Sequence, residues 1–262
     1  MAERQWMLEF EFLGTGNAGG VPLWGCHCSA CESARQDSRL RRKSASAVIR
    51  CGQKATLIDA GITELAEYFR FEEVERVLLT HFHMDHVQGL FPLRWAECGE
   101  RIPVYRPDDP EGADDLYKHP GAFEFLPPSE LFREIDFGEF SVTPLPLIHS
   151  RVTQGLLIRK GNWRLAYLTD TVGLPDQTLE HLQAYPLDEL VLDCSEPPRE
   201  APPRNHNDLN AALSTWRETG AKRLWLTHIS HRLENWLMEG GKLPDGVAPA
   251  YDGLILSPSH DF

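Results

Sequence analysis

The chain has 262 residues and a formal net charge of −13 at pH 7. Hydrophobic residues make up 42% and charged residues 25%, as in globular proteins, and no apolar run reaches the ~18 residues that span a bilayer. The acidic balance disfavours nucleic acid, whose partners usually carry a basic face. We therefore expect a single domain over residues 1–262 that binds neither nucleic acid nor membrane.

The first 16 residues alternate polar and apolar side chains and lack the basic and apolar regions of a secretion signal. We therefore predict a cytoplasmic protein, in which cysteines more often bind metals or stay buried as thiols than form disulfides. Cys26, Cys28 and Cys31 lie within six positions. This spacing predicts a metal site, but tetrahedral zinc needs a fourth ligand.

Short stretches rich in β-branched and aromatic residues, bounded by Gly, Pro or Asp, predict strands. Apolar residues at helical spacing, such as Leu209, Ala212 and Leu213, predict helices. Early strands followed by strand–helix alternation indicate a layered α/β fold with mixed sheets. The expected strands are residues 7–13, 46–50, 55–60, 74–80, 139–147, 154–159, 163–169, 189–194, 222–227 and 252–257; the expected helices are 62–69, the segment after 86, 176–185 and 206–218.

The stretch VLLTHFHMDHVQGL (77–90) is the most informative. A buried strand is expected to end at Thr80, and His81, His83, Asp85 and His86 follow within six positions. Imidazole and carboxylate groups bind Zn, Mn or Fe. A His-rich surface turn is the alternative, but this density at a strand end favours a metal site.

Single polar residues end three further strands, namely His149, Asp170 and His228. Each alone could be a cap or a loop residue. The strand ends of layered α/β folds converge on one site, so with the previous stretch these residues supply seven ligands. Seven ligands suffice for two metals that share one carboxylate.

The HxHxDH motif with isolated His, Asp and His at later strand ends resembles the metallo-β-lactamase superfamily. The stretches at 14–31, 78–95, 114–121, 143–150, 170–175, 193–210 and 226–231 resemble, more narrowly, the PhnP family of phosphoribosyl cyclic phosphodiesterases of the carbon–phosphorus lyase pathway. The resemblance implies an α/β fold, an αβ/βα sandwich of two facing mixed sheets flanked by helices. It also implies a homodimer.

The resemblance implies one metal held by His81, His83 and His149, a second held by Asp85, His86 and His228, and Asp170 between them. Manganese is expected, although these ligands also suit Zn or Fe. The implied reaction converts 5-phospho-α-D-ribosyl 1,2-cyclic phosphate to α-D-ribose 1,5-bisphosphate, with a hydroxide formed between the metals attacking phosphorus. Asp85 and His206 are the expected catalytic residues, and His206 would assist the leaving oxygen. From the residues alone, His206 could equally belong to the N-cap region of its helix.

His231 is the expected fourth ligand of the three cysteines, because His228 is committed to the metal pair and the family pattern agrees. A closed Cys₃His set has no open position, so we predict a structural zinc. His27 is the local alternative, but its place between Cys26 and Cys28 would strain a tetrahedron.

The substrate's 5-phosphate needs a cation or backbone N–H groups. Lys118, His119, Arg204 and the basic run 39–43 are candidates, although the run more readily forms a solvated face. Competing functions are a tRNA-processing nuclease or a general cyclic phosphodiesterase of the same superfamily, and a non-catalytic metal-binding subunit. The charge of −13 and the lack of an extended basic arm argue against the nuclease.

Overall fold

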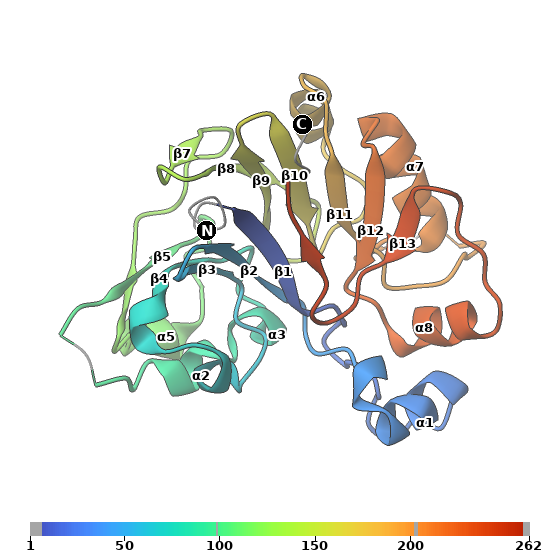
Figure 1. Ribbon diagram of the computed structural model, residues 1–262, viewed down its shortest axis with the longest axis horizontal. Coiled ribbons are helices and arrows are strands. Elements are labelled where there is room, and N and C mark those ends of the chain that lie inside the picture. Colours follow the sequence, from blue (N-terminus) through green and yellow to red (C-terminus); the bar gives the residue numbers. More distant parts are fainter. Residues whose placement is uncertain (1–6, 98, 202–203, 259–262) are drawn as a thin grey trace.

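The computed structural model describes residues 7–97, 99–201 and 204–258. Two seven-stranded sheets face each other, with helices on their outer faces (Figure 1), which confirms the predicted αβ/βα sandwich. The first sheet runs β14 (Ile255–Leu256), β1 (Leu8–Gly14), β2 (Ser46–Cys51), β3 (Lys54–Ile58), β4 (Val74–Leu78), β5 (Ile102–Tyr105) and β6 (Phe123–Phe125). The second runs β13 (Val247–Pro249), β12 (Arg223–Thr227), β11 (Glu189–Asp193), β10 (Trp163–Leu168), β9 (Gln154–Lys160), β8 (Ser141–Pro146) and β7 (Ile135–Asp136).

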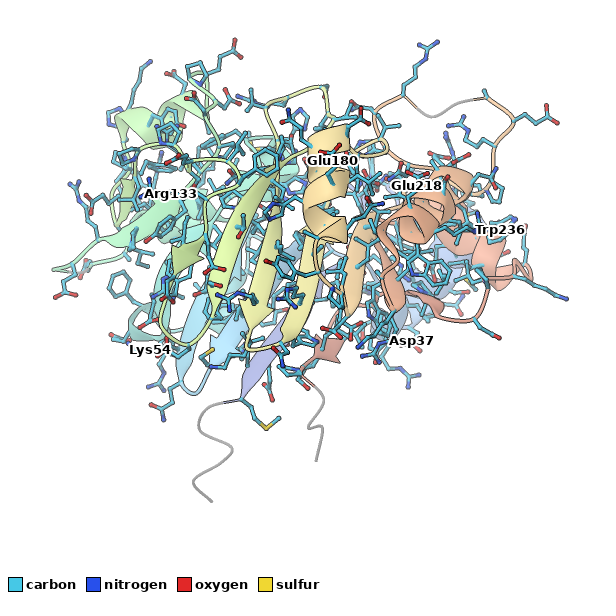
Figure 2. All side chains as sticks on the ribbon, turned by 90° about the horizontal axis from the view of Figure 1, so that it is seen from above. Asp37, Lys54, Arg133, Glu180, Glu218 and Trp236 are labelled. Carbon is cyan, nitrogen blue, oxygen red and sulfur yellow. The ribbon has the colours of Figure 1, made fainter. Side chains whose placement is uncertain are left out.

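The helices divide between the two halves of the sandwich. The first half carries the 3₁₀ turn η3 (Phe71–Glu73) and helices α2 (Leu65–Tyr68), α3 (Met84–Val87), α4 (Leu90–Leu93) and α5 (Asp114–Lys118); the second half carries α6 (Asp176–Gln183), α7 (Leu209–Thr219) and α8 (His231–Met238). The 3₁₀ turn η2 (Ser38–Leu40) instead contacts the helix that precedes it in the chain. Helix α1 (Ser29–Gln36) packs beside α8 although their sequences lie far apart. Figure 2 shows α6 and α7, which carry the labelled Glu180 and Glu218, over the outer face of the second sheet. None of the helices in the described parts is long and apolar enough to cross a membrane.

Apolar side chains form three layers. One lies between the sheets and includes Phe10 and Tyr167; Leu57 belongs to the layer under the helices of the first sheet and Leu190 to the layer under those of the second. Strand β11 is buried along its whole length, as expected for a parallel strand covered on both faces. Burial of these faces leaves the strand ends as the place for polar side chains.

The parallel strands bring their carboxyl ends to common edges. Strand β3 pairs in parallel with β4, and β10, β11 and β12 pair in parallel with one another. Asp59 and His81 follow the first pair of strands, and Asp170 and His228 follow β10 and β12. The chain therefore delivers residues from both sheets to one site.

All of the strands expected from the sequence occur, with shifts of a few residues at their ends. Strands β5, β6, β7 and β13 were not expected, because they are very short and β5 and β13 contain proline, which is depleted in strands. Helices α1, α5 and α8 were also missed. Helix α1 begins within the cysteine motif, with Cys28 as its N-cap residue.

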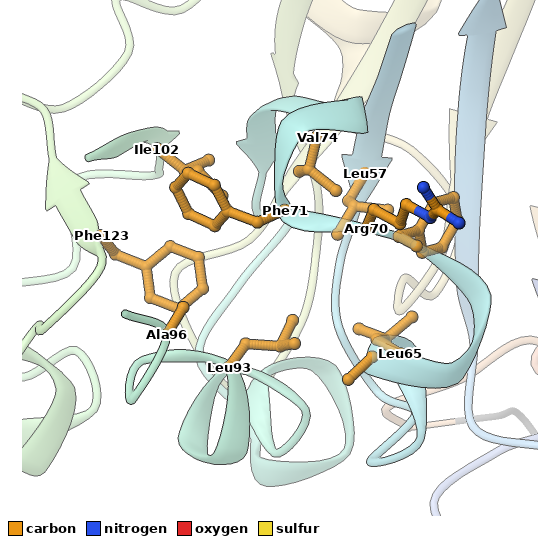
Figure 3. A pocket seen from close by; sticks show the side chains of 11 residues that line it. Leu57, Leu65, Arg70, Phe71, Val74, Leu93, Ala96, Ile102 and Phe123 are labelled. Carbon is orange, nitrogen blue, oxygen red and sulfur yellow. The ribbon is translucent and has the colours of Figure 1, made fainter. Parts of the chain in front are cut away.

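An apolar cavity of about 150 Å³ lies between the first sheet and its helices (Figure 3). Leu57, Leu65 and Phe123 form part of its wall, and Arg70 is the one charged residue lining it among the described residues. The wall carries no histidine or carboxylate. The cavity is therefore a gap in the packing, separate from the polar strand ends.

Candidate metal centre

Three imidazole nitrogens and one carboxylate oxygen converge at the ends of β4, β8 and β10. His83 Nδ1 lies 3.0 Å from His81 Nε2 and 3.1 Å from His149 Nε2. Asp170 Oδ1 lies 3.7 Å from the same nitrogen of His81 and 3.6 Å from that of His149. Ligands of a tetrahedral ion with bonds of about 2.0–2.1 Å lie roughly 3.3–3.4 Å apart. This group therefore has the spacing to hold one metal ion.

A second group lies on the other side of Asp170. Asp85 Oδ2 lies 3.5 Å from His86 Nε2 and 3.7 Å from His228 Nε2. Asp170 Oδ2 is 3.2 Å from the former nitrogen and Asp170 Oδ1 is 3.4 Å from the latter. Asp170 thus faces both groups with its two oxygens. The structure brings together all seven residues that the sequence predicted as ligands. That they bind metal stays a prediction.

Two buried nitrogens of this centre have no hydrogen-bond partner among the described residues. They are His86 Nε2 and His228 Nε2, and both rings are almost completely buried. An unpaired buried polar atom costs about 1–3 kcal/mol, so native sites rarely contain one without a function. Both nitrogens face carboxylates, so a cation between them would satisfy both kinds of group. The residues therefore fit a divalent metal.

In three of the ligand histidines, the ring nitrogen that faces away from the metal-binding groups contacts another protein atom. Asn205 O lies 3.1 Å from His149 Nδ1, and a carbonyl can only accept, so this nitrogen carries the proton. Thr80 Oγ1 lies 3.0 Å from His81 Nδ1 and donates its own proton to Asp59. Ser195 Oγ lies 2.9 Å from His228 Nδ1. These contacts fix the tautomers that leave Nε2 free to bind a metal.

His86 is held by a carboxylate that the sequence interpretation missed. Asp59 is fully buried and lies 2.7 Å from His86 Nδ1. It also accepts hydrogen bonds from the Thr80 backbone N–H at 2.8 Å and from the Thr80 hydroxyl at 2.7 Å. Asp59 follows buried strand β3, as the predicted ligands follow theirs. The strand-end signal could therefore have found it.

The electrostatics of the centre also favour a cation. Burial lowers the pKa of His81 and of His149, which keeps both imidazoles in the neutral, ligating form. Burial acts to raise the pKa of Asp170, but the charges of His228 and His86 hold it well below its usual range. Burial likewise acts to lower the pKa of His86, but Asp170 and Asp59 raise it well above its ordinary value. A metal ion would replace the proton that these carboxylates attract.

Three residues of the centre have left-handed backbone conformations. Asp59, Asp170 and His228 have φ of 58°, 59° and 57°. Non-glycine residues adopt this region at a cost of about 1–3 kcal/mol, mostly where the surrounding structure enforces it and often at functional sites. The turn at each strand end therefore aims one side chain into the centre.

His206 lies beside the metal ligands. Its ring stacks on that of His228 with a centroid distance of 4.6 Å, and its Nδ1 lies 2.7 Å from Asp193 Oδ2. Burial acts to lower its pKa, but the hydrogen bond and charge of Asp193 raise the pKa of His206 to about 9. It does not cap helix α7, because Asp208 accepts from the Ala211 backbone N–H there. The N-cap alternative is therefore wrong, and Asp193 is a second missed carboxylate.

The predicted zinc ligands form a separate cluster between α1 and α8. The sulfur atoms of Cys26 and Cys28 lie 3.3 and 3.6 Å from His231 Nδ1, and Cys31 Sγ completes a group whose ligand atoms all lie within 4.8 Å of one another. A tetrahedral zinc would put sulfur and nitrogen roughly 3.5–3.6 Å apart. His27 instead pairs with Glu32 at 2.8 Å. The structure therefore favours His231 over His27 as the fourth ligand.

The predicted phosphate-binding residues separate into two groups. Lys118 pairs with Asp114 at 2.8 Å, and His119 follows the last residue of α5. Arg42, within the basic run 39–43, is buried and pairs with Glu234 at 2.7 Å. Arg204 lines a pocket together with His206. Residues 202–203 of the neighbouring motif lie outside the described parts.

Known proteins share this architecture. A model of the β-lactamase superfamily domain matches residues 55–229. A solved diphosphatase from the PhnP family shares 30% identity with a TM-score of 0.80, over 96% of this chain and 97% of that one.

Two curated relatives match less closely. An octanoyltransferase of Porphyromonas gingivalis is 28% identical over 92% of this chain and 50% of that protein, so the chain spans about half its length. The probable metallo-hydrolase YhfI of Bacillus subtilis is 27% identical over 69% of this chain and 77% of that protein. Because the domain model covers more than half of the sequence, the chain belongs to the metallo-β-lactamase superfamily.

Proposed function

We propose that this protein is a metal-dependent phosphodiesterase that hydrolyses 5-phospho-α-D-ribosyl 1,2-cyclic phosphate to α-D-ribose 1,5-bisphosphate in phosphonate catabolism. The observation that carries the proposal is the position of His206, stacked on His228 and hydrogen-bonded to Asp193 beside two metal-binding groups. The 30% identity to a PhnP-family diphosphatase over almost the whole chain supports a phosphoryl substrate.

Two bound divalent ions, which we expect to be manganese, would lower the pKa of a water and offset negative charge on the phosphoryl oxygens. The chain itself would supply the proton for the leaving group. Asp193 holds His206 Nδ1 at 2.7 Å, so Nε2 is the nitrogen free to serve the substrate. As the bond from phosphorus to the 2-oxygen breaks, the proton passes from this nitrogen to that oxygen. Asp85, the other expected catalytic residue, would act beside His86 and His228 by holding one of these ions.

Diphosphate hydrolysis is the second candidate, because the PhnP-family structure is described as a diphosphatase. The two ligand groups of the metal centre would hold their ions in the same way for a diphosphate as for a cyclic diester, because both reactions attack phosphorus. We do not propose acyl transfer for this chain, because the match covers only half of the octanoyltransferase. The charge of −13 argues against tRNA, and the convergence of seven ligand residues argues against a non-catalytic subunit.

The test compares two leaving groups in metal-reconstituted protein. His206→Ala should lower kcat on the cyclic phosphate by about 10²–10⁴-fold, the usual contribution of a general acid. It should have much less effect on bis-nitrophenyl phosphate, whose leaving group needs no proton. His27→Ala serves as the control, because this exposed histidine pairs only with Glu32 among the described residues. Equal losses on both substrates would refute the acid role.

A second experiment tests the reaction itself. Asp170→Ala should abolish hydrolysis of both substrates while the circular dichroism spectrum stays native. No turnover by the wild type with Mn, Zn or Fe would favour the non-catalytic subunit. Turnover of a diphosphate but not of the cyclic phosphate would favour the diphosphatase. The homodimer and the cytoplasmic location stay predictions.

A further inference from the structure

A polar pocket of about 360 Å³ adjoins His206. Two loops form it, one after β1 and one between β11 and α7. Asn17 comes from the first loop, and Arg199, Arg204 and Asn205 come from the second. Neither loop supplies a predicted ligand of the metal centre, although Ser195 and Asn205 of the second loop orient two of the ligand histidines. The pocket is therefore a second binding region next to the proposed acid.

The rest of the protein fixes the amides of this pocket. The Asn17 backbone N–H donates to Ile229 O at 3.2 Å, which ties the first loop to the residue after His228. Asn17 Oδ1 accepts from the Gly19 N–H at 3.2 Å, and its side-chain NH₂ group donates to none of the described residues. Asn205 holds His149 Nδ1 with its carbonyl. The pocket is thus built into the frame of the metal ligands.

The charges of the pocket are unbalanced. The guanidinium groups of Arg199 and Arg204 make no hydrogen bond or ion pair with any described residue, whereas most arginines elsewhere in the described chain are paired. Glu196 is the one acidic residue lining the pocket among those described, and it lies 3.4 Å from Arg232. A chain with a net charge of −13 therefore presents, beside its proposed acid, two cations that have no partner among the residues the structure describes.

We propose that this pocket binds the second, non-reacting phosphate of the substrate, and that Arg199 and Arg204 determine specificity for a phosphorylated sugar. The inference rests on the proposed function. Guanidinium groups bind phosphate oxygens through paired, charge-assisted hydrogen bonds, and amide N–H groups such as those of Asn17 add further donors. Lys118, an earlier candidate for this role, is paired with Asp114 instead.

The test measures selectivity, defined as kcat/KM for the 5-phosphorylated cyclic phosphate divided by kcat/KM for its 5-hydroxyl analogue. Arg199→Ala and Arg204→Ala should each lower this ratio by about 10–100-fold, as expected for loss of hydrogen bonds to a charged group. The corresponding lysine variants should recover part of it. Arg164→Ala is the control, because this residue lies at the opposite end of β10 from Asp170 and stacks on Tyr185. An unchanged ratio in both alanine variants would overturn the proposal.

Failure of the proposed function would look different. In that case the wild type would hydrolyse neither cyclic phosphate, although it hydrolyses bis-nitrophenyl phosphate. Phosphate binding in the pocket would then be measured by competitive inhibition of bis-nitrophenyl phosphate hydrolysis, with ribose 5-phosphate as the probe and ribose as the reference. Weaker inhibition by ribose 5-phosphate in the two alanine variants would support the phosphate site, and equal inhibition in variants and wild type would overturn it.

Discussion

Asp59→Asn tests whether the protein sets the tautomer of a metal ligand. Asp59 accepts three hydrogen bonds of 2.7–2.8 Å, from the Thr80 N–H, the Thr80 hydroxyl and His86 Nδ1. Asparagine has the same shape, but only one of its two terminal atoms accepts. If that oxygen keeps the Thr80 N–H, the NH₂ group faces His86. His86 must then accept at Nδ1 and carry its proton on Nε2, the nitrogen that should bind the metal.

The expected loss follows from this exchange. Changes to residues that orient a ligand typically cost ~10–100-fold in metal affinity, which corresponds to about 1.4–2.7 kcal/mol. The loss should fall on the group formed by Asp85, His86 and His228. The group formed by His81, His83 and His149 is linked to Asp59 through the Thr80 hydroxyl, whereas Asn205 orients its His149 independently. This group should therefore lose less affinity.

Metal titration against a competing chelator measures the two affinities, and the melting temperature of the metal-free protein checks the fold. Asp188→Asn is the matched control, because this carboxylate also accepts a backbone N–H, from Arg164 at 2.9 Å, but lies at the other end of the strands. Two metals bound with wild-type affinity by Asp59→Asn would refute the tautomer argument. Equal weakening of both groups would do so as well.

Two further predictions concern stability. His231→Ala should lose one zinc per chain by metal analysis and melt at a lower temperature, whereas His27→Ala should keep that zinc; full occupancy in His231→Ala would contradict the proposed ligand set. Tyr167→Phe should raise the free energy of unfolding by about 1 kcal/mol, because the buried Tyr167 hydroxyl has no partner among the described residues. A loss of stability, measured by urea denaturation, would show that this hydroxyl is satisfied in solution.

The sequence predicted the metal groups because their signal is local. His81, His83, Asp85 and His86 occupy six positions after one strand, and no tertiary information is needed to see their density. Asp59 and Asp193 were not predicted, because each is a single carboxylate at a strand end with no histidine beside it in the sequence. Only the pairing of β3 with β4 places Asp59 against His86. The strand-end position thus marks Asp59 as a candidate, but its role in orienting His86 is recognisable only from the fold.

The missed secondary structure has a related cause. Strands β5 and β6 have four and three residues, too few for a periodic pattern to develop. They form because β4 offers a parallel edge and the apolar layer beneath needs cover. Helix α8 begins at His231, which the sequence marked only as a ligand. In each case tertiary contacts outweigh a weak local preference.

The two predicted metal sites differ in how far hydrogen bonds from the protein hold their side chains in place. In the metal pair, Thr80, Asp59, Asn205 and Ser195 hold the ring nitrogens that face away from the metals. In the cysteine cluster, the Leu23 N–H at 3.3 Å is the one group outside the cluster that donates to Cys31 Sγ among the described residues, and burial raises the pKa of Cys31 to about 12. A thiol with so high a pKa stays protonated until zinc displaces its proton. The ligand rings of the pair are therefore held in place by the protein itself. We expect the cysteine cluster to need zinc to hold α1 firmly against α8, so a chelator that strips both sites should loosen the α1–α8 contact before it disturbs the strand ends.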